Sequence, residues 1–182
     1  MQSSDMRPAV FLDRDGVINE DKKYASDPKV AVLLPGVAGA IKRLNDAGIT
    51  TIVVSNQSGV ARGYHSEDDV RRFNSTLASQ LQEAGARIDG WYYCPHLPGG
   101  AILEYAKECE CRKPKSGMLT QAAREHNIDF SKSYMVGDKE RDIVAGATAG
   151  TKTILVGGEE SNHAPGYRAR DLADAVDLIL SR

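Results

Sequence analysis

Two aspartates, Asp13 and Asp15, flank a single arginine and precede a glycine directly after an apolar run. Asp and Gly favour turns, so the simplest structural interpretation of this stretch is a tight turn. If both carboxylates leave a strand at alternate positions, however, they can point into one cleft as a nucleophile and a general acid and base. Asp138 and Asp142 add two acids later in the chain. Four carboxylates in one cleft would repel each other unless a divalent cation were bound there.

Two further segments carry groups that suit a phosphoryl group. Ser55 and Asn56 follow the β-branched run TTIVV, where they either cap a loop or donate hydrogen bonds to phosphoryl oxygens. Lys113 stands in an Arg-Lys-Pro sequence. A lone lysine is usually a solvated surface residue, but just before a helix on the ligand side its ammonium would neutralise a transferring phosphoryl group.

All three cysteines fall in the segment 94–112, here called the cysteine loop. His96 follows Cys94 at i+2, and 12 residues separate it from the pair Cys109 and Cys111. Three thiolates and an imidazole are a complete tetrahedral ligand set for zinc, and with no open position that zinc would be structural. The i, i+2 pairs are tighter than the common C-x₂-C spacing, and three unrelated buried cysteines are the alternative. A loop of about 20 residues with no helix or strand pattern needs something to order it, which favours zinc.

Short apolar runs alternate with longer amphipathic segments along the chain. The expected strands are 9–12, 50–54, 88–93, 133–136 and 153–156, and the expected helices are 36–47, 66–84, 116–127, 141–149 and 171–180. This alternation predicts right-handed crossovers and an α/β fold, with a doubly wound, five-stranded, Rossmann-like parallel sheet. Ligands bind beyond the carboxyl ends of parallel strands, and Asp13, Ser55, Cys94 and Asp138 are expected there.

The composition and net charge of the chain exclude several classes of protein. The chain has 182 residues, of which 41% are hydrophobic and 26% charged, as expected for a single globular domain over 1–182. A formal net charge of −2 disfavours generic nucleic-acid binding. The longest apolar stretch, 30–41, is too short to span a bilayer, and the N-terminus has no basic start followed by an apolar signal core. We therefore expect a cytoplasmic monomer that acts on a small molecule, with no nucleic-acid or membrane partner.

Together and in this order, these segments resemble the four motifs of the haloacid dehalogenase-like phosphatase superfamily. The motifs appear as Asp13-Arg14-Asp15-Gly16-Val17, Ser55-Asn56, Lys113, and Gly137-Asp138-Lys139-Glu140-Arg141-Asp142. The resemblance implies that Asp13 attacks phosphorus to form an aspartyl-phosphate and that Asp15 serves as acid and base. It implies that Ser55 and Lys113 hold the phosphoryl oxygens. It also implies a catalytic Mg²⁺ held by Asp13, the backbone carbonyl of Asp15, and Asp138.

The cysteine loop narrows the resemblance. A zinc loop before the Arg-Lys-Pro sequence is similar to that of the D-glycero-D-manno-heptose 1,7-bisphosphate 7-phosphatases, and it also occurs in histidinol-phosphate phosphatases. The first loop, with Asn19, Asp21 and Tyr24, and the run 56–64 are similar to the heptose branch. This branch implies removal of the 7-phosphate in nucleotide-activated heptose biosynthesis for cell-surface glycans, lipopolysaccharide among them. Histidinol-phosphate phosphatase, a broader sugar-phosphate phosphatase and a non-catalytic phosphate-binding scaffold remain as alternatives.

No large cap domain is expected, because the segments 16–34 and 94–112 are each about 20 residues long, far below domain size. These two loops must then select the substrate. Arg112 is the candidate ligand of the second, non-reacting phosphate, because a guanidinium binds phosphate with two hydrogen bonds. Asp142 is expected to orient Lys113 or to act through water. The residues expected to contact the substrate are Asp21, Lys22, Lys23, Tyr24, Ser55, Asn56, Gln57, Ser58, Arg112, Lys113 and Lys139.

Overall fold

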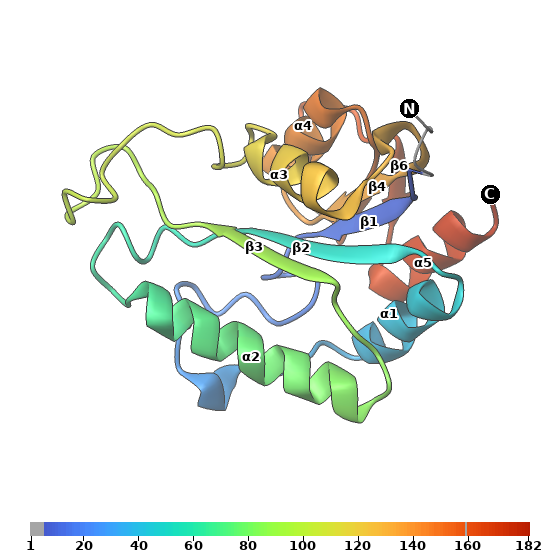
Figure 1. The fold of residues 1–182 in the computed structure, drawn as a ribbon, viewed down its shortest axis with the longest axis horizontal. Helices are drawn as coiled ribbons and strands as arrows, with labels where there is room; N and C mark the ends of the chain where they lie inside the picture. The colour runs from blue at the N-terminus through green and yellow to red at the C-terminus, as the bar shows by residue number, and fades with distance from the viewer. Residues whose placement is uncertain (1–5, 159) are drawn as a thin grey trace.

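The computed structural model describes residues 6–158 and 160–182, which form a six-stranded parallel sheet in the order β3-β2-β1-β4-β5-β6 (Figure 1). The strands are β1 (Ala9–Leu12), β2 (Thr50–Asn56), β3 (Gly90–Cys94), β4 (Tyr134–Gly137), β5 (Lys152–Val156) and β6 (Tyr167–Ala169). The helices are α1 (Val37–Asp46), α2 (Glu67–Glu83), α3 (Gly117–His126), α4 (Glu140–Ala149) and α5 (Leu172–Leu180), with short 3₁₀ helices at Pro28–Val30 and Phe130–Lys132. The order reverses between β1 and β4, where open parallel sheets bind ligands at their carboxyl edge.

The α/β, doubly wound arrangement is as predicted, but the prediction of five strands is wrong. The sixth strand, β6, pairs in parallel with β5, with Ile154 opposite Tyr167 and Val156 opposite Ala169. A three-residue strand is too short to carry a periodic pattern of its own, so no local signal distinguishes it from a loop. It forms because the edge of β5 offers unpaired backbone groups.

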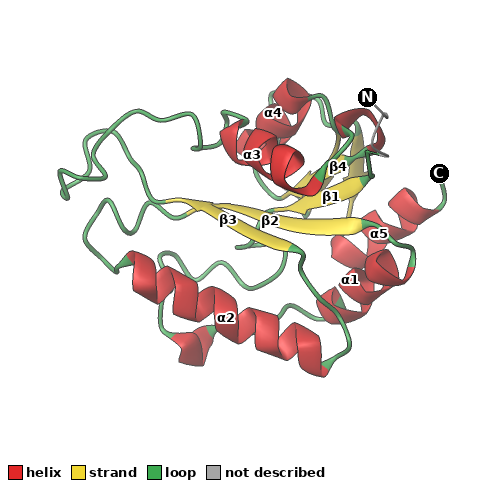
Figure 2. Ribbon diagram, viewed as in Figure 1, coloured by secondary structure: helices red, strands yellow, loops and turns green. Residues whose placement is uncertain are grey.

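The helices cover both faces of the sheet (Figure 2). Along β1, Val10 and Leu12 face the core under α1, α2 and α5, whereas Ala9 and Phe11 face the core under α3 and α4. All four side chains are fully buried. Because successive side chains of a strand point to opposite faces, a strand covered on both sides needs a continuous apolar run, which β1 has.

A capping box fixes the start of α2, the helix that follows β2 in the chain. The hydroxyl of Ser66 accepts a hydrogen bond from the backbone of Asp69, and the Asp69 carboxylate accepts one from the backbone of Ser66. This reciprocal pair is what a Ser-x-x-Asp sequence predicts at a helix start. It anchors the end of the loop 57–65, which lies beside the site described below.

Two long connections reach beyond the carboxyl edge of the sheet. The first, residues 13–36, contains only the 3₁₀ helix Pro28–Val30, and the second is the cysteine loop. The backbone N–H of Ile102 in the cysteine loop donates to the carbonyl of Ala61 at 2.9 Å, so the loop after β2 lies against it (Figure 1). In the part of the chain that the structure describes, neither connection forms a large cap domain.

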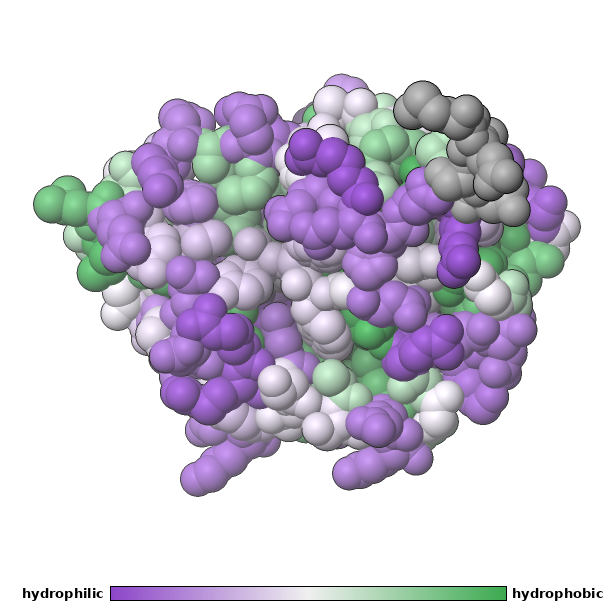
Figure 3. All heavy atoms as spheres, viewed as in Figure 1, coloured by the Kyte–Doolittle hydropathy of each residue, from purple (hydrophilic) through white to green (hydrophobic). Residues whose placement is uncertain are grey.

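Apolar side chains gather on the surface at the far end of the cysteine loop, at the left of Figure 3. Ile102 is 41% exposed there and Leu103 is 90% exposed. Elsewhere the same face of the molecule is mostly polar. No helix among the described residues is both long and apolar enough to cross a membrane.

Candidate active site

The carboxylate of Asp13 lies where the strand order reverses. Asp13 follows β1 directly, and its backbone N–H donates to the carbonyl of Val136 in β4 at 3.0 Å. Its Oδ1 accepts hydrogen bonds from the backbone N–H of Arg14 at 2.9 Å and from Lys113 Nζ at 2.9 Å. Its Oδ2 is buried and has no hydrogen-bond partner in the described structure. One oxygen of Asp13 is therefore fixed, and the other is free to react or to bind a cation.

Two glycines allow the acidic segments to approach each other. Gly16 has a φ of +88°, in the left-handed region, and a Cβ built on it would lie 2.3 Å from Asp138 Oδ2. A Cβ built on Gly137 would lie 2.2 Å from the Cβ of Asp142. A side chain at either position would displace one of these acids, so only glycine brings the segment after β4 this close to its neighbours.

Lys113 is a buried cation between two carboxylates. Its Nζ lies 2.9 Å from Asp13 Oδ1 and 2.7 Å from Asp142 Oδ1, and it donates to the carbonyl of Val54 at 2.8 Å. Burial by itself would lower the pKa of Lys113, but the charges of Asp13 and Asp142 outweigh that effect and raise the pKa above its usual value. The lysine therefore stays charged, and it contacts Asp142 directly.

Asp13, Asp138 and Asp142 form a carboxylate cluster in which one oxygen from each lies within 4.8 Å of the others. Asp138 Oδ1, like Asp13 Oδ2, is buried without a partner in the described structure. Burial, and then the charges of Asp13 and Asp142, raise the pKa of Asp138 to about 7. Burial and the charge of Asp142 also raise the pKa of Asp13. Buried, mutually repelling carboxylates with free oxygens fit a hard divalent cation, which prefers oxygen ligands.

Asp15 is placed apart from this cluster by donors on three sides. Arg14 Nη2 lies 3.0 Å from both carboxylate oxygens of Asp15. Asn19 Nδ2 donates to Oδ1 at 2.9 Å, and Gln57 Nε2 donates to Oδ2 at 2.9 Å. Both oxygens of Asp15 are therefore occupied by protein donors, in contrast to the free oxygens of Asp13 and Asp138.

The polar residues after β2 have different partners. Gln57 Nε2 donates to Ser55 Oγ at 2.7 Å as well as to Asp15, so it bridges these two side chains. Asn56 Nδ2 donates to the backbone carbonyl of Lys113 at 2.9 Å, and Asn56 Oδ1 accepts from the backbone N–H of Lys113 at 3.0 Å. Asn56 thus holds the backbone of the buried lysine, and both ends of its amide are occupied. Ser58 lies further along the loop and is half-buried.

The predicted contacts in the first connection lie on the surface, where Tyr24 meets the loop after β2. Asp21, Lys22 and Lys23 are exposed. Tyr24 is 46% exposed, and its ring meets the ring of Tyr64, in the loop after β2, edge-on with centroids 5.0 Å apart. Lys23 and Tyr24 have φ values of 42° and 61°, in the left-handed region that non-glycine residues rarely adopt. Strained backbone of this kind is often found at ligand sites.

The two remaining predicted contacts, Lys139 and Arg112, have different partners. Lys139 Nζ lies 3.4 Å from Asp138 Oδ2, beside a cavity of about 370 Å³ that Gly16 and Gly157 also line. Arg112 Nη1 donates to the backbone carbonyl of His96 at 3.2 Å, so this guanidinium is tied to the cysteine loop. One N–H group of the five in a guanidinium is used by that bond.

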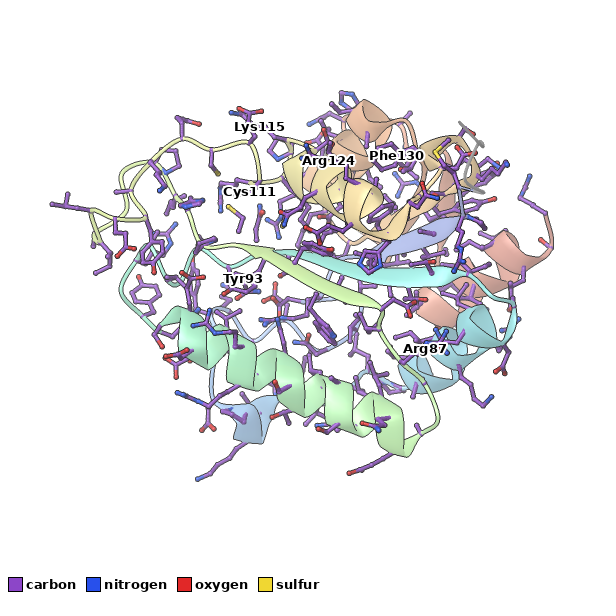
Figure 4. All side chains as sticks on the ribbon, viewed as in Figure 1. Arg87, Tyr93, Cys111, Lys115, Arg124 and Phe130 are labelled. Atoms are coloured by element: carbon purple, nitrogen blue, oxygen red, sulfur yellow. The ribbon has the colours of Figure 1, made fainter. Side chains whose placement is uncertain are left out.

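The four predicted zinc ligands meet in the cysteine loop, with one ligand atom from each within 4.8 Å of the others; Figure 4 labels one of them, Cys111. The Sγ atom of Cys111 lies 3.1 Å from that of Cys94, 3.4 Å from that of Cys109 and 3.3 Å from His96 Nδ1. Ligand atoms on a tetrahedral zinc are separated by about 3.3–3.8 Å when the bonds are 2.0–2.3 Å long. The Sγ atoms of Cys94 and Cys109, 3.6 Å apart, and Cys94 Sγ and His96 Nδ1, 3.7 Å apart, lie within this range. The neighbouring Cys94 thiol, and then His96, lower the pKa of Cys111 to about 5. Three cysteine sulfurs and one imidazole nitrogen are a donor set that fits zinc.

A polar contact independent of these ligands ties the cysteine loop to α2. Glu67, the first residue of α2, accepts hydrogen bonds from Tyr93 Oη at 2.6 Å and from Tyr105 Oη at 2.9 Å. Burial and the contact with Glu67 raise the pKa of Tyr93 to about 12, so it remains a donor. Tyr105 lies in the cysteine loop, and the loop is therefore braced from the helix as well as by contacts among its own cysteines and His96.

Three residues near the site have roles that the sequence analysis did not assign: Arg14, Asn74 and Glu67. Arg14 stands between the two motif aspartates, and its burial gives no local signal. Asn74 Oδ1 accepts a hydrogen bond from Arg14 Nη1 at 2.9 Å, and it lies in the middle of α2 among buried apolar side chains. The one available signal was that an asparagine on the apolar side of an amphipathic helix needs a buried partner.

The chain has named relatives along almost its whole length. A family profile described as HAD-hydrolase-like matches residues 110–177. The D-glycero-beta-D-manno-heptose-1,7-bisphosphate 7-phosphatase of Haemophilus ducreyi is 45% identical over 177 residues, which cover 95% of this chain and 97% of the relative. The D-glycero-D-manno-heptose-1,7-bisphosphate 7-phosphatase of Thermosynechococcus vestitus is 45% identical over 187 residues, which cover 95% of each chain. This chain belongs to the heptose-bisphosphate phosphatase family of HAD-like hydrolases.

Solved structures of the heptose-bisphosphate phosphatase family share the fold. The D,D-heptose 1,7-bisphosphate phosphatase of B. bronchiseptica, complexed with magnesium and phosphate, has a TM-score of 0.82 at 31% identity, covering 96% of this chain and 98% of that one. The phosphatase from Burkholderia thailandensis has a TM-score of 0.71 at 29% identity, covering 97% and 100%. The resemblance drawn from the motifs is confirmed at the level of the family, and the chain is a phosphatase.

Proposed function

We propose that this phosphatase removes the 7-phosphate of D-glycero-D-manno-heptose 1,7-bisphosphate, in the supply of activated heptose for cell-surface glycans. The observation that carries the proposal is the free, buried Oδ2 of Asp13. It lies on a carboxyl group fixed by Lys113 and surrounded by the other acids of the cluster. A carboxylate oxygen with no other partner, on a carboxyl group that Lys113 holds in place, suits attack on phosphorus. The names of the two relatives in Haemophilus ducreyi and Thermosynechococcus vestitus support the heptose bisphosphate as substrate.

The proposed reaction has two steps. Asp13 Oδ2 attacks phosphorus, the bond from phosphorus to the C7 oxygen breaks, and Asp15 gives its proton to the leaving oxygen. Asp15 then takes a proton from a water molecule, whose oxygen attacks the phosphorus and releases Asp13. Inorganic phosphate leaves, Asp15 is protonated again, and no proton or electron is left over. Asp15 is suited to both transfers because Gln57 places it beside Ser55.

Ser55 and Lys113 are proposed to hold the non-bridging oxygens, on which charge is spread in the transition state. Mg²⁺ would be held by Asp13, the backbone carbonyl of Asp15, and Asp138. When bound, it supplies positive charge that offsets both the carboxylate cluster and the phosphoryl oxygens. Asp142 positions Lys113, because the two side chains form a fully buried ion pair.

The second phosphate of the substrate needs its own anchor, since the described structure has no large cap to enclose the sugar. Arg112 is proposed as that anchor, with residues 21–24 contacting the sugar. A zinc ion on Cys94, His96, Cys109 and Cys111 would hold the cysteine loop, and thereby Arg112, in place. Binding energy from the remote phosphate can then align the reacting one.

The test is the ratio of kcat/KM values on heptose 1,7-bisphosphate and histidinol phosphate, with ³¹P NMR to identify the product. The proposal predicts a strong preference for the bisphosphate, with heptose 1-phosphate accumulating. A preference for histidinol phosphate would make the chain a histidinol-phosphate phosphatase, and similar values on many sugar phosphates would make it a broad enzyme. Absence of magnesium-dependent hydrolysis, even of p-nitrophenyl phosphate, would leave only a binding scaffold.

A further inference from the structure

Arg14 is a charged side chain buried as deeply as the aliphatic core. It is 1% exposed, and it heads the large side chains that are fully buried in the described structure. Its guanidinium lies 4.4 Å from the centroid of the Phe73 ring, and its Nη1 donates to Asn74 Oδ1 at 2.9 Å. Phe73 and Asn74 both belong to α2. Burial of a guanidinium destabilises the folded state unless its N–H groups have acceptors and its faces pack against other groups. Here α2 supplies a ring, Phe73, and an acceptor, Asn74 Oδ1.

The remaining edge of the Arg14 guanidinium faces Asp15. Nη2 lies 3.0 Å from each oxygen of the Asp15 carboxyl group, and Nε lies 3.3 Å from Oδ1. Side chains of adjacent residues rarely form such a contact, since the arginine must fold back along the backbone to reach its neighbour. The backbone N–H of the same residue donates to Asp13 Oδ1 at 2.9 Å. Residue 14 therefore touches both of the aspartates that flank it.

The Asp15 carboxyl group has a choice of two environments. Carboxylates are good ligands for divalent cations, and the cluster of Asp13, Asp138 and Asp142 begins two residues away. Rotation of Asp15 toward that cluster would remove it from proton transfer. The contacts of Arg14, with Gln57 on the opposite oxygen, favour the orientation toward Ser55. Lysine could not reproduce them, because only the planar guanidinium can serve a carboxylate, an amide and an aromatic ring at once.

We propose that Arg14, braced by Phe73 and Asn74, is a positioning residue that keeps the Asp15 carboxyl group beside Ser55 and out of the carboxylate cluster, where it can protonate the leaving group. The inference rests on the proposed function, since it assigns Arg14 a role in the proton transfers of Asp15. In this arrangement α2, a helix that holds none of the proposed catalytic residues, fixes the orientation of Asp15 through Arg14.

The test compares two leaving groups. A sugar alkoxide leaves only when protonated, whereas p-nitrophenolate leaves without a proton. Arg14→Met should therefore lower kcat/KM on heptose bisphosphate about 10²–10³-fold, and that on p-nitrophenyl phosphate less than about tenfold. Inhibition by inorganic phosphate should change less than about twofold, because Asp13, Ser55 and Lys113 are intact. Arg14→Lys should recover only part of the loss. Equal losses on both substrates, or normal kcat/KM on both, would overturn the proposal.

Further variants separate positioning from a folding defect. Asn74→Leu removes the brace but leaves Arg14 in place, so it should produce a smaller loss with the same preference for the aryl substrate. Arg72→Met is the matched control, because Arg72 lies on the exposed side of α2 and pairs only with Asp69 among the described contacts. Arg72→Met should leave kcat/KM on both substrates unchanged. If Arg14→Met does not fold, Arg14→Lys and Asn74→Leu still test the proposal, through the ratio of kcat/KM on heptose bisphosphate to kcat/KM on p-nitrophenyl phosphate.

A double substitution distinguishes failure of this inference from failure of the proposed function. If Arg14 acts through Asp15, adding Arg14→Met to Asp15→Asn should reduce alkyl phosphate turnover less than about threefold further. Fully additive losses would show that Arg14 acts by another route and would overturn the inference alone. Normal alkyl phosphate turnover in Asp15→Asn would overturn the proposed role of Asp15, and the inference would fall with it.

Discussion

Lys113 Nζ lies 2.7 Å from Asp142 Oδ1, and neither side chain has any exposed surface. The lysine follows the cysteine loop, and the aspartate is in the first turn of α4. A buried ion pair of this kind gains little over an apolar pair of the same shape, but breaking it leaves an uncompensated charge. Because Lys113 also contacts Asp13, the pair fixes the ammonium beside the proposed nucleophile.

Replacing Lys113 by methionine should therefore damage both activity and stability. Lys113→Met leaves Asp13 and Asp142 facing each other without a cation from the protein, and the free energy of unfolding should fall by about 3–5 kcal/mol. The value of kcat should fall more than about 10²-fold, since a donor to the transition state is lost. Lys115→Met is the control, because the described ion pairs of Lys115, with Glu108 and Glu110, are exposed, and the substitution should change stability by less than about 1 kcal/mol. Urea unfolding and steady-state kinetics check both, and an active, stable Lys113→Met protein would contradict the assignment.

The cysteine cluster should hold about one zinc per chain that survives dialysis, while activity depends on added magnesium. Cys109→Ser should lose the zinc and raise KM for heptose bisphosphate more than it lowers kcat, because the cysteine loop carries Arg112. Tryptic cleavage at Lys107 should become faster in the variant. Glu108→Gln, next to a ligand but not one itself, should behave as the unmodified protein. Zinc-free protein of unchanged melting temperature and protease resistance would contradict a structural zinc.

Arg112 should serve the second phosphate rather than the chemical step. Arg112→Ala should reduce kcat/KM on heptose bisphosphate about 10²-fold, equivalent to roughly 2–3 kcal/mol for a lost bidentate contact. It should barely affect p-nitrophenyl phosphate, which has no second phosphate. Because Arg112 also donates to the His96 carbonyl, zinc content must be measured in the same samples. Equal losses on both substrates at full zinc content would mean that Arg112 supports the chemistry or the fold instead.

Without magnesium, the contribution of Asp138 should make the free energy of unfolding decrease as the pH rises. Burial and neighbouring carboxylates raise the pKa of Asp138 to about 7 in the folded state, so between its ordinary value and that pH the folded state binds a proton that the unfolded state does not. Under linkage, this makes the free energy of unfolding fall as pH rises. In magnesium-free buffer the loss between pH 5.5 and 8 should be about 1–2 kcal/mol, with solvent screening included.

Magnesium should oppose this loss, so the stabilisation by added magnesium should be larger at pH 8 than at pH 5.5. Asp138→Asn should flatten the pH dependence and remove most of the magnesium effect. Thermal denaturation across that pH range, with and without magnesium, measures both. The same pH dependence in Asp138→Asn as in the unmodified protein, both without magnesium, would contradict the raised pKa.

Local signals in the sequence predict most of the sheet and where the site lies. The apolar run 9–12 predicts the bounds of β1, and the Ser66 capping box predicts the start of α2. Both elements lie where these signals predict them. The rule that ligands bind beyond parallel strands then places Asp13, Ser55 and Asp138 at one edge. β6 escapes prediction because its pairing depends on the edge of β5 and not on its own three residues.

Side-chain partnerships between distant segments are what the sequence does not predict. Arg14 reaches Asn74 across 60 positions of the chain, so nothing near Arg14 indicates that it is buried or that it folds back on Asp15. Asn56 was expected to contact substrate, yet its amide is paired with the backbone of Lys113. Such pairings follow from the packing of α2 and of the Arg-Lys-Pro segment against the sheet, which only the folded structure shows.

The covalent step on Asp13 can be measured in the Asp15→Asn variant with p-nitrophenyl phosphate. This leaving group needs no proton, so Asp13 should still be phosphorylated, whereas hydrolysis of the aspartyl-phosphate should be slow without the Asp15 base. Rapid mixing should give a burst of about one p-nitrophenolate per active site, with phosphate trapped by acid on the peptide that contains Asp13 and no burst in Asp13→Asn. Turnover that is linear from the first milliseconds, with no phosphate on the protein, would contradict Asp13 as the nucleophile.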